Sequence, residues 1–122
     1  LTIFRRDINL KESINEKDIL EYLKKTSIDI DKNLIKEADK LFDSKIKDAK
    51  TVEEIKKIIE GGAIARVNFC SVDKDGAVCA EKVEKEIGAQ VRGTKLEKEK
   101  ATGKCAICGK IAKEVVYIAR QY

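Results

Sequence analysis

With 122 residues, the chain is long enough for one domain, or for a small domain with an additional lobe. It contains no histidine, so catalysis that needs an imidazole, such as a Ser-His-Asp triad, cannot be completed within it. The formal net charge is +4, and the excess basic charge lies in residues 61–122 without forming the clustered footprint of a module that binds nucleic acid by itself.

The first fifty residues predict a short strand followed by two helices. The chain begins at Leu1 rather than methionine, so we expect a piece of a longer protein. Residues 1–7, LTIFRRD, favour a strand, which we interpret as the last strand of a missing preceding domain or as an edge strand. Asn15 can cap a first helix and Asp31 a second. Apolar residues recur at helical spacing in that second helix: Leu34, Ile35, Ala38, Leu41, Phe42 and Ile46.

A capping box predicts a third helix after residue 50. Thr51 and Glu54 have the spacing of this motif, and the glycines of EGG, residues 60–62, favour the end of the helix. Its expected buried stripe is Val52, Ile55, Ile58 and Ile59. We expect the three helices to form a packing and spacing element, because none carries a residue pattern typical of a reactive site.

The second half predicts the order strand, helix, strand, loop, strand. SVDKDG, residues 71–76, is a polar turn in which Gly76 is free to take a positive φ. The other segments are a buried strand at 63–69, a helix from near Cys79 to Ile87, a strand at 89–93, a charged loop at 94–103 and a strand at 112–122. This order predicts an α+β fold, with a small β-sheet covered by helices and a helical linker region before it.

Three of the four cysteines adjoin predicted strand ends or turns, where a closed site could tie distant segments together. Cys70 and Cys79 are separated by eight residues, and Cys105 and Cys108 by two, with a glycine directly after Cys108. A Cys-x-x-Cys pair followed by glycine can fold into a tight knuckle in which both sulfurs point at one ion. Structural zinc takes four ligands, commonly all cysteine, so this set favours a closed zinc site without a catalytic role for the metal.

Three other interpretations of the cysteines remain open. A thioredoxin-like redox pair places its Cys-x-x-Cys before a helix, whereas a predicted strand follows Cys108. Disulfides belong mainly to secreted proteins, of which these lysine- and glutamate-rich helices bear no other mark. An iron–sulfur cluster also accepts four cysteines, and the spacing does not exclude one.

Three stretches carry a resemblance to a known family. GGAIARVNFC, CAEKVEKEIGAQVRG and GKCAICGKIAKEVVYIARQY resemble the C-terminal zinc-binding domain of archaeal and eukaryotic-type prolyl-tRNA synthetases. FRRD, residues 4–7, resembles the closing strand of the anticodon-binding domain of that family. The resemblance is densest over residues 52–122. It implies a closing strand at 1–14, a helical connecting region at 15–50 and a zinc-binding domain at 51–122.

The resemblance also implies a function and a set of site residues. The family's enzymes use ATP to attach proline to tRNA(Pro), and ATP and magnesium would bind in a catalytic domain outside this chain. The piece itself would be non-catalytic, and its structural zinc would be held by Cys70, Cys79, Cys105 and Cys108. Tyr122 would end the native chain, with its carboxylate directed toward the active site, and Arg5 and Arg6 are candidate tRNA contacts. As solvated residues at a strand end, the two arginines have a purely structural interpretation as well.

The expected partners follow from the same resemblance. They are the catalytic and anticodon-binding domains of the same enzyme, tRNA(Pro), and a second copy in a homodimer, in the cytoplasm and without a membrane. The alternative is a free-standing zinc-ribbon-like module that binds RNA or protein. Such a module would interleave basic and aromatic residues, but the aromatic residues here are scattered: Phe4, Tyr22, Phe42, Phe69, Tyr117 and Tyr122.

Overall fold

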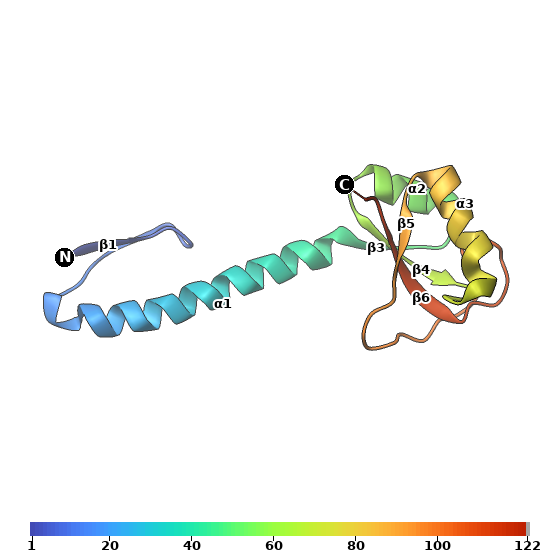
Figure 1. The fold of residues 1–122 in the computed structure, drawn as a ribbon. Coiled ribbons are helices and arrows are strands. Elements are labelled where there is room, and N and C mark those ends of the chain that lie inside the picture. Colours follow the sequence, from blue (N-terminus) through green and yellow to red (C-terminus); the bar gives the residue numbers. More distant parts are fainter. Residues whose placement is uncertain (122) are drawn as a thin grey trace. The chain divides into compact units, whose positions relative to one another are not determined.

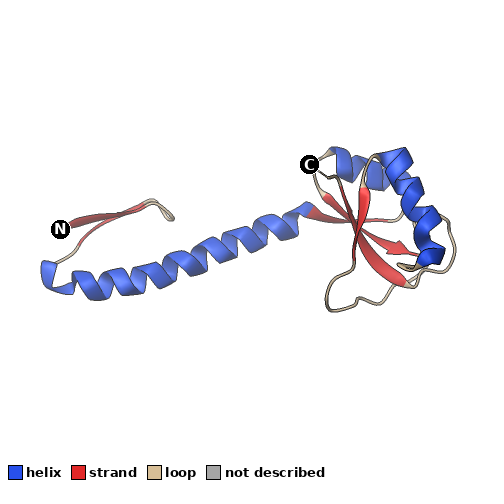
Figure 2. Cartoon of the chain, in the orientation of Figure 1, coloured by secondary structure: helices blue, strands red, loops and turns tan. Residues whose placement is uncertain are grey.

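The computed structural model describes residues 1–121, which form two compact units with a boundary between Asp43 and Ser44. Tyr122, the predicted end of the native chain, lies outside the described residues. Each unit has its own secondary structure, shown in Figure 1 and Figure 2. Among the described residues, no helix combines the length and the apolar character that crossing a membrane requires.

The first unit contains a β-hairpin and most of a long helix. Strand β1 (Thr2–Arg5) pairs antiparallel with β2 (Leu10–Ser13), and Asn9 in the turn adopts a φ of 53°. Asparagine tolerates this left-handed conformation better than most residues. After the 3-10 turn η1 (Glu16–Asp18), helix α1 (Ile19–Lys45) extends for 27 residues. The strand at the start of the chain therefore has a local partner that the sequence did not indicate.

The prediction of two separate helices in this region was wrong. Helix α1 continues through Asp31, because residues 19–45 contain neither glycine nor proline and an aspartate inside a helix costs only about 0.7 kcal/mol relative to alanine. Asn15 holds the N-cap position of η1, and its carbonyl oxygen accepts a hydrogen bond from the Asp18 amide at 3.1 Å. Ile46, expected on the second helix, begins a strand instead.

The second unit is a four-stranded sheet with helices against it. Its elements are β3 (Ile46–Ala49), α2 (Val52–Glu60), β4 (Ile64–Phe69), the 3-10 turn η2 (Lys74–Gly76), α3 (Ala77–Ile87), β5 (Gln90–Gly93) and β6 (Glu114–Ala119). The strand order is β3-β4-β6-β5. Strands β3 and β4 are parallel, as the intervening helix α2 allows, and the other two pairs are antiparallel. The predicted α+β architecture is confirmed.

Helix α2 begins at the predicted capping residue. The Glu54 amide donates a hydrogen bond to Thr51 Oγ1 at 3.2 Å, and the Glu54 carboxylate accepts one from the Lys50 amide at 2.7 Å. Both contacts satisfy amide groups that would otherwise lack a partner at the start of a helix. Ile55 and Ile59 of the predicted stripe are buried, and Val52 and Ile58 pack beside them.

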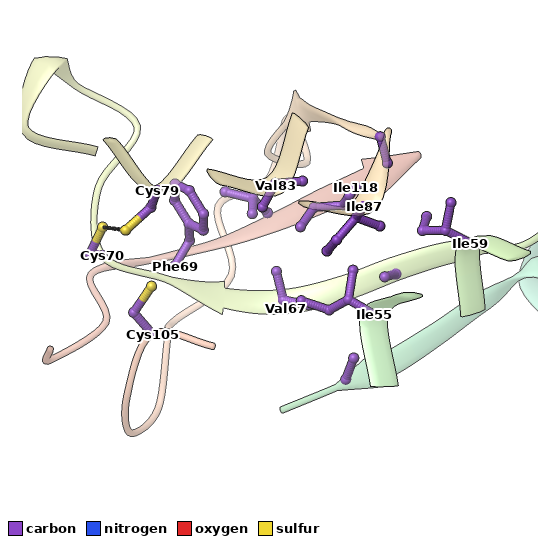
Figure 3. Close-up of a cluster of buried hydrophobic side chains, with 14 residues drawn as sticks. Ile55, Ile59, Val67, Phe69, Cys70, Cys79, Val83, Ile87, Cys105 and Ile118 are labelled. Atoms are coloured by element: carbon purple, nitrogen blue, oxygen red, sulfur yellow. Dashed lines mark hydrogen bonds between the residues drawn. The ribbon is translucent and has the colours of Figure 1, made fainter. Parts of the chain in front are cut away.

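One face of the sheet and the two helices enclose the core (Figure 3). Alternate residues of β4 point into it, because side chains of a strand alternate between the faces of a sheet. The core contains Ile55, Ile59, Ala65, Val67, Phe69, Val83, Ile87, Val116 and Ile118, all below 10% exposure. Phe69, the last residue of β4, is 1% exposed and directly precedes Cys70. The end of β4 is thus fixed by the core at the point where the cysteines begin.

The opposite face of the sheet is crossed by residues 94–103, which we call the strap. Glu99 of the strap accepts hydrogen bonds from the Tyr117 hydroxyl at 2.6 Å and from the Arg66 guanidinium at 3.0 and 3.1 Å. The Lys95 ammonium lies 5.7 Å from the centre of the Tyr117 ring. The predicted charged loop is therefore attached to the sheet through its own charges, and it leads directly to Cys105.

Candidate metal centre

Three segments of the chain bring the cysteines together. Cys70 directly follows β4, and Cys79 lies in the first turn of α3. Cys105 and Cys108 lie in a tight turn between the strap and β6, which we call the knuckle, residues 105–110. The four Sγ atoms all lie within 4.8 Å of one another. Segments far apart in the sequence therefore converge on one point.

Burial is uneven among the four thiols. Cys70, Cys79 and Cys105 are at most 9% exposed, whereas Cys108 is exposed. Figure 3 shows the sulfur atoms of Cys70 and Cys79 directed at each other, 3.6 Å apart, with Cys105 pointing toward them from the knuckle. This separation is far longer than the roughly 2 Å of a disulfide bond, and all four cysteines are free thiols.

Backbone hydrogen bonds close the knuckle. The Cys105 amide donates to the Lys110 carbonyl at 2.7 Å, and the Gly109 amide donates to the Cys105 carbonyl at 3.0 Å. The Ile107 amide donates a hydrogen bond to Cys105 Sγ at 3.5 Å. Gly109 has a φ of 72°, a conformation that glycine adopts without the strain a side chain would bring. The glycine after Cys108 is therefore explained by the geometry of the turn.

The loop between the first two cysteines is held just as tightly. The Asp73 amide donates to Ser71 Oγ at 3.1 Å, and the Gly76 amide donates to the Asp73 carbonyl at 2.9 Å. The expectation that Gly76 takes a positive φ was wrong, because its φ is −88°. Glycine is needed here for space: a Cβ atom at position 76 would lie 1.9 Å from the Ser71 carbonyl oxygen.

The protonation of the thiols follows their surroundings. Burial raises the pKa of the Cys70 thiol and raises that of the Cys79 thiol further, because a thiolate is poorly solvated there. The position of Cys79 near the start of α3 does not offset this burial. A backbone hydrogen bond from Lys110 lowers the pKa of Cys108 to about 7. A cation bound between the sulfurs would stabilise the thiolate forms of Cys70 and Cys79, which burial alone disfavours.

The donor set fits one metal ion. Around a tetrahedral zinc with Zn–S distances near 2.3 Å, sulfurs lie about 3.8 Å apart. The observed limit of 4.8 Å, with one pair at 3.6 Å, is close to that spacing. A multi-iron cluster spreads its cysteine ligands more widely than a single ion does. Bound there, the ion would cross-link β4, α3 and the knuckle through Cys70, Cys79, Cys105 and Cys108.

A redox interpretation of the Cys-x-x-Cys pair has little structural support. The residues that follow Cys108 form a turn closed by Gly109, and the next element is strand β6. Thioredoxin-like pairs instead precede a helix, whose N-terminus stabilises the attacking thiolate. The knuckle provides no such helix.

The two arginines of the first unit lie in different environments. Arg5 forms an ion pair with Asp7 at 2.7 Å, and its side chain is 14% exposed. Asp7 also accepts a hydrogen bond from Asn33 of α1 at 3.2 Å. Arg5 therefore helps to hold the hairpin on the helix, whereas Arg6 is exposed. Both arginines belong to the first unit, whereas the four cysteines belong to the second.

The sequence did not indicate Asn68, which contacts both segments around the second cysteine pair. Its side chain pairs with Thr102 of the strap, and its carbonyl oxygen accepts from the Ala106 amide in the knuckle at 3.0 Å. One signal was available, because Arg66 and Asn68 are polar residues two apart in a strand that was predicted to be buried. That spacing indicates a second face with partners of its own.

Known proteins show the same arrangement of sequence and fold. A family described as “Prolyl-tRNA synthetase, C-terminal” matches residues 52–122. The chain belongs to this family. The matched residues begin at the start of α2 and include all four cysteines. The resemblance found in the sequence is therefore confirmed.

Individual members of the prolyl-tRNA synthetase family extend the match to the whole chain. The proline–tRNA ligase of Thermofilum pendens is 32% identical over 124 aligned positions, covering 100% of this chain and 25% of the relative. That of Alkaliphilus oremlandii is 33% identical, covering 98% of this chain and 24% of the relative. The chain therefore spans about a quarter of the length of these relatives.

Solved structures agree with this assignment. The Giardia lamblia prolyl-tRNA synthetase in complex with prolyl-adenylate superimposes with a TM-score of 0.88 at 25% identity, covering 99% of this chain and 26% of that one. The Cryptosporidium parvum enzyme has a TM-score of 0.86 at 18% identity, which shows the shared fold. Both comparisons include the hairpin and α1 as well as the cysteine-bearing sheet.

Proposed function

We propose that the chain is the C-terminal part of a cytoplasmic proline–tRNA ligase, in which it is a non-catalytic structural element. The observation that carries this proposal is the convergence of four cysteine sulfurs within 4.8 Å, in a chain that belongs to the prolyl-tRNA synthetase C-terminal family. ATP, magnesium and proline would bind in a catalytic domain elsewhere in the enzyme. The absence of histidine from this chain is consistent with a role outside the chemistry.

The proposed metal is zinc, with a structural role. Four sulfur ligands leave no open position for water or substrate, so the ion would hold the fold together rather than activate a reactant. In a small domain the free energy of zinc binding adds directly to the free energy of folding. In the described part of the second unit, the largest side chains with less than 2% exposure form a small core: Phe69, Ile55, Ile118, Val67, Val83 and Val116. A metal cross-link at one end of its core would compensate for that small size.

We propose that the first unit contains the end of an anticodon-binding domain and the helical region that connects this domain to the next one. Several apolar side chains on α1 are 48–72% exposed: Leu20, Leu23, Ile28, Leu34, Ile35, Leu41 and Phe42. Such a set on one helix favours burial against further protein. We assign residues 1–14 to the end of that domain and residues 15–43 to a connecting region. The sequence placed the next boundary at residue 51, but β3 pairs with β4, so we propose that the zinc domain begins at Ser44.

Three finer roles belong to the same proposal. Arg6 is exposed and available for a contact with tRNA(Pro), whereas Arg5 is already engaged by Asp7. The carboxylate of Tyr122 would be directed toward the active site of the catalytic domain. The complete enzyme would function as a homodimer.

The decisive experiment uses the complete protein. The coding sequence upstream of Leu1 is included, and the purified product is assayed for proline-dependent exchange between ATP and pyrophosphate and for prolylation of tRNA(Pro). We expect both activities, with loss of prolylation on removal of ATP. A product that binds RNA or protein tightly but lacks both activities would overturn the proposal in favour of the free-standing zinc-ribbon-like module.

A further inference from the structure

Asn68 occupies an unusual position at the end of β4. The pairing of β3 with β4 ends at Ala49 opposite Val67, so Asn68 lies one residue beyond it. Carbonyl groups of a strand alternate in direction, and that of Phe69 accepts from the Lys113 amide beside β6. The Asn68 carbonyl therefore points to the side that β3 has left, where it accepts from the Ala106 amide at 3.0 Å. The knuckle takes the place of a neighbouring strand.

The side chain of Asn68 makes a second junction, this time with the strap. Its Nδ2 donates to the Thr102 carbonyl oxygen at 2.6 Å, and its Oδ1 accepts from the Thr102 amide at 3.4 Å. A side-chain amide has a donor and an acceptor side by side, so it can pair with both backbone groups of one residue. Aspartate would lose the donor, and alanine would lose both contacts. Thr102 is three residues before Cys105.

We propose that Asn68 is the positioning residue of the metal centre: it fixes Thr102 and Ala106, on either side of Cys105, and so places the second cysteine pair opposite Cys70 before the ion binds. This inference rests on the proposed zinc site. Cys70 follows Asn68 by two residues. Segments attached to Asn68 are therefore held close to Cys70. The end of β4 therefore carries the attachment for the segment with two ligands, and the residue directly after it, Cys70, provides a third.

A positioning residue acts on affinity without being a ligand. In Asn68→Ala the carbonyl of residue 68 remains, but the strap is released at Thr102, so the metal-free knuckle samples more conformations. Binding zinc then requires these segments to be ordered at the same time, which lowers the affinity. The number of ligands and their chemistry stay the same. We expect about fivefold to twentyfold weaker zinc binding, in line with the loss of one or two hydrogen bonds.

The test compares the full chain with three variants. Zinc affinity is measured by competition with a chromophoric chelator for wild type, Asn68→Ala, Asn68→Asp and Ile59→Val. The last variant removes one buried methylene in α2, away from the cysteines, and controls for a general loss of stability. Cobalt spectra at saturation check that four thiolates still bind. Hydrogen exchange of the Thr102 and Ala106 amides is measured in the metal-free chain.

The proposal expects weaker zinc binding in both Asn68 variants, an unchanged cobalt spectrum and at least tenfold faster exchange of the Thr102 amide. Ile59→Val should bind zinc as wild type does. Equal affinity in wild type and Asn68→Ala, or an equal loss in Ile59→Val, would overturn the role of Asn68 while leaving the zinc site in place. Failure of the wild-type chain to bind zinc would overturn both the zinc site and this inference.

Discussion

The backbone of Gly76 lies so close to Ser71 that a Cβ atom at position 76 would come within 1.9 Å of the Ser71 carbonyl oxygen. This close approach lies within the loop between Cys70 and Cys79. The large apolar side chains between these cysteines, Val72 and Val78, are 48% and 75% exposed, so neither is buried in the core. The close approach of Gly76 to Ser71 therefore contributes to the loop conformation that brings the first two sulfurs together.

Gly76→Ala is therefore expected to destabilise the second unit. Because the obstructing atoms belong to the backbone, the loop must move, and we expect a cost of about 2–3 kcal/mol together with weaker zinc binding. Urea unfolding followed by circular dichroism measures the first effect. Gly61→Ala is the matched control, since its φ is −74° and the nearest atom to an added Cβ lies at 3.4 Å. Equal stability of the two variants would contradict the proposed tightness of the loop.

The contacts of Glu99 predict a dependence of stability on pH. Hydrogen bonds from the Tyr117 hydroxyl and then from Arg66 lower the pKa of the Glu99 carboxyl below its ordinary value. A carboxyl whose pKa is lower in the folded state stabilises the fold at neutral pH, and this contribution is lost as the pH falls below about 4.5. Glu99→Gln should lower the free energy of unfolding by about 1 kcal/mol at pH 7 and by progressively less at lower pH.

The measurement is urea unfolding of wild type and Glu99→Gln at pH 7, 5 and 3.5. Glu97→Gln, in the same strap but exposed, controls for the change in net charge. A difference between wild type and Glu99→Gln that stays constant across this range would show that the carboxylate charge does not attach the strap.

The size of Phe69 gives a prediction for the core. Its side chain is 1% exposed and packs next to the cysteine site, so Phe69→Ala should cost about 3–5 kcal/mol through loss of buried surface and the cavity left behind. Leu96→Ala, at a fully exposed position in the strap, should change the stability by less than about 0.5 kcal/mol. Thermal unfolding of the two variants compares them directly. Similar melting temperatures would contradict the placement of the core.

The first unit allows a comparison of two neighbouring arginines. Arg5→Ala removes the partner of Asp7 and should loosen the hairpin from α1, which faster hydrogen exchange of the β1 and β2 amides would show. In the wild-type chain, the hydrogen bond with Arg5 is the main cause of the low pKa of the Asp7 carboxyl. In Arg5→Ala this pKa should rise toward its ordinary value. Arg6→Ala should leave both properties as in wild type. If Arg6→Ala loosened the hairpin as much as Arg5→Ala, the difference between their environments would be disproved.

Some of the fold could be predicted from residues that act locally. Thr51 with Glu54 and the glycines of residues 60–62 indicated the two ends of α2, because caps and left-handed residues such as Gly62 determine helix ends without distant contacts. The order of β4, α3, β5 and β6 followed from such signals. The spacing of Cys105 and Cys108 with Gly109 likewise indicated a knuckle, a structure that depends on a few adjacent residues.

Other features depended on partners far away in the sequence. Ile46 continued the helical pattern of α1, yet it forms β3 because β4 offers backbone groups alongside it. Leu10–Ser13 has little strand character of its own and pairs with β1 through the turn at Asn9. Asn68 was inconspicuous because its importance lies in contacts with Thr102 and Ala106, more than thirty residues later. Such long-range pairings cannot be deduced from a local pattern.

The most direct test of the account is the metal content of the purified chain combined with its thermal unfolding. We predict one equivalent of zinc, and a melting temperature at least about 10 °C lower after removal of the metal or in Cys105→Ser, whereas Ala106→Ser in the same knuckle keeps both metal and stability. A chain without bound metal whose melting temperature is unaffected by zinc, by a chelator and by Cys105→Ser would contradict the account.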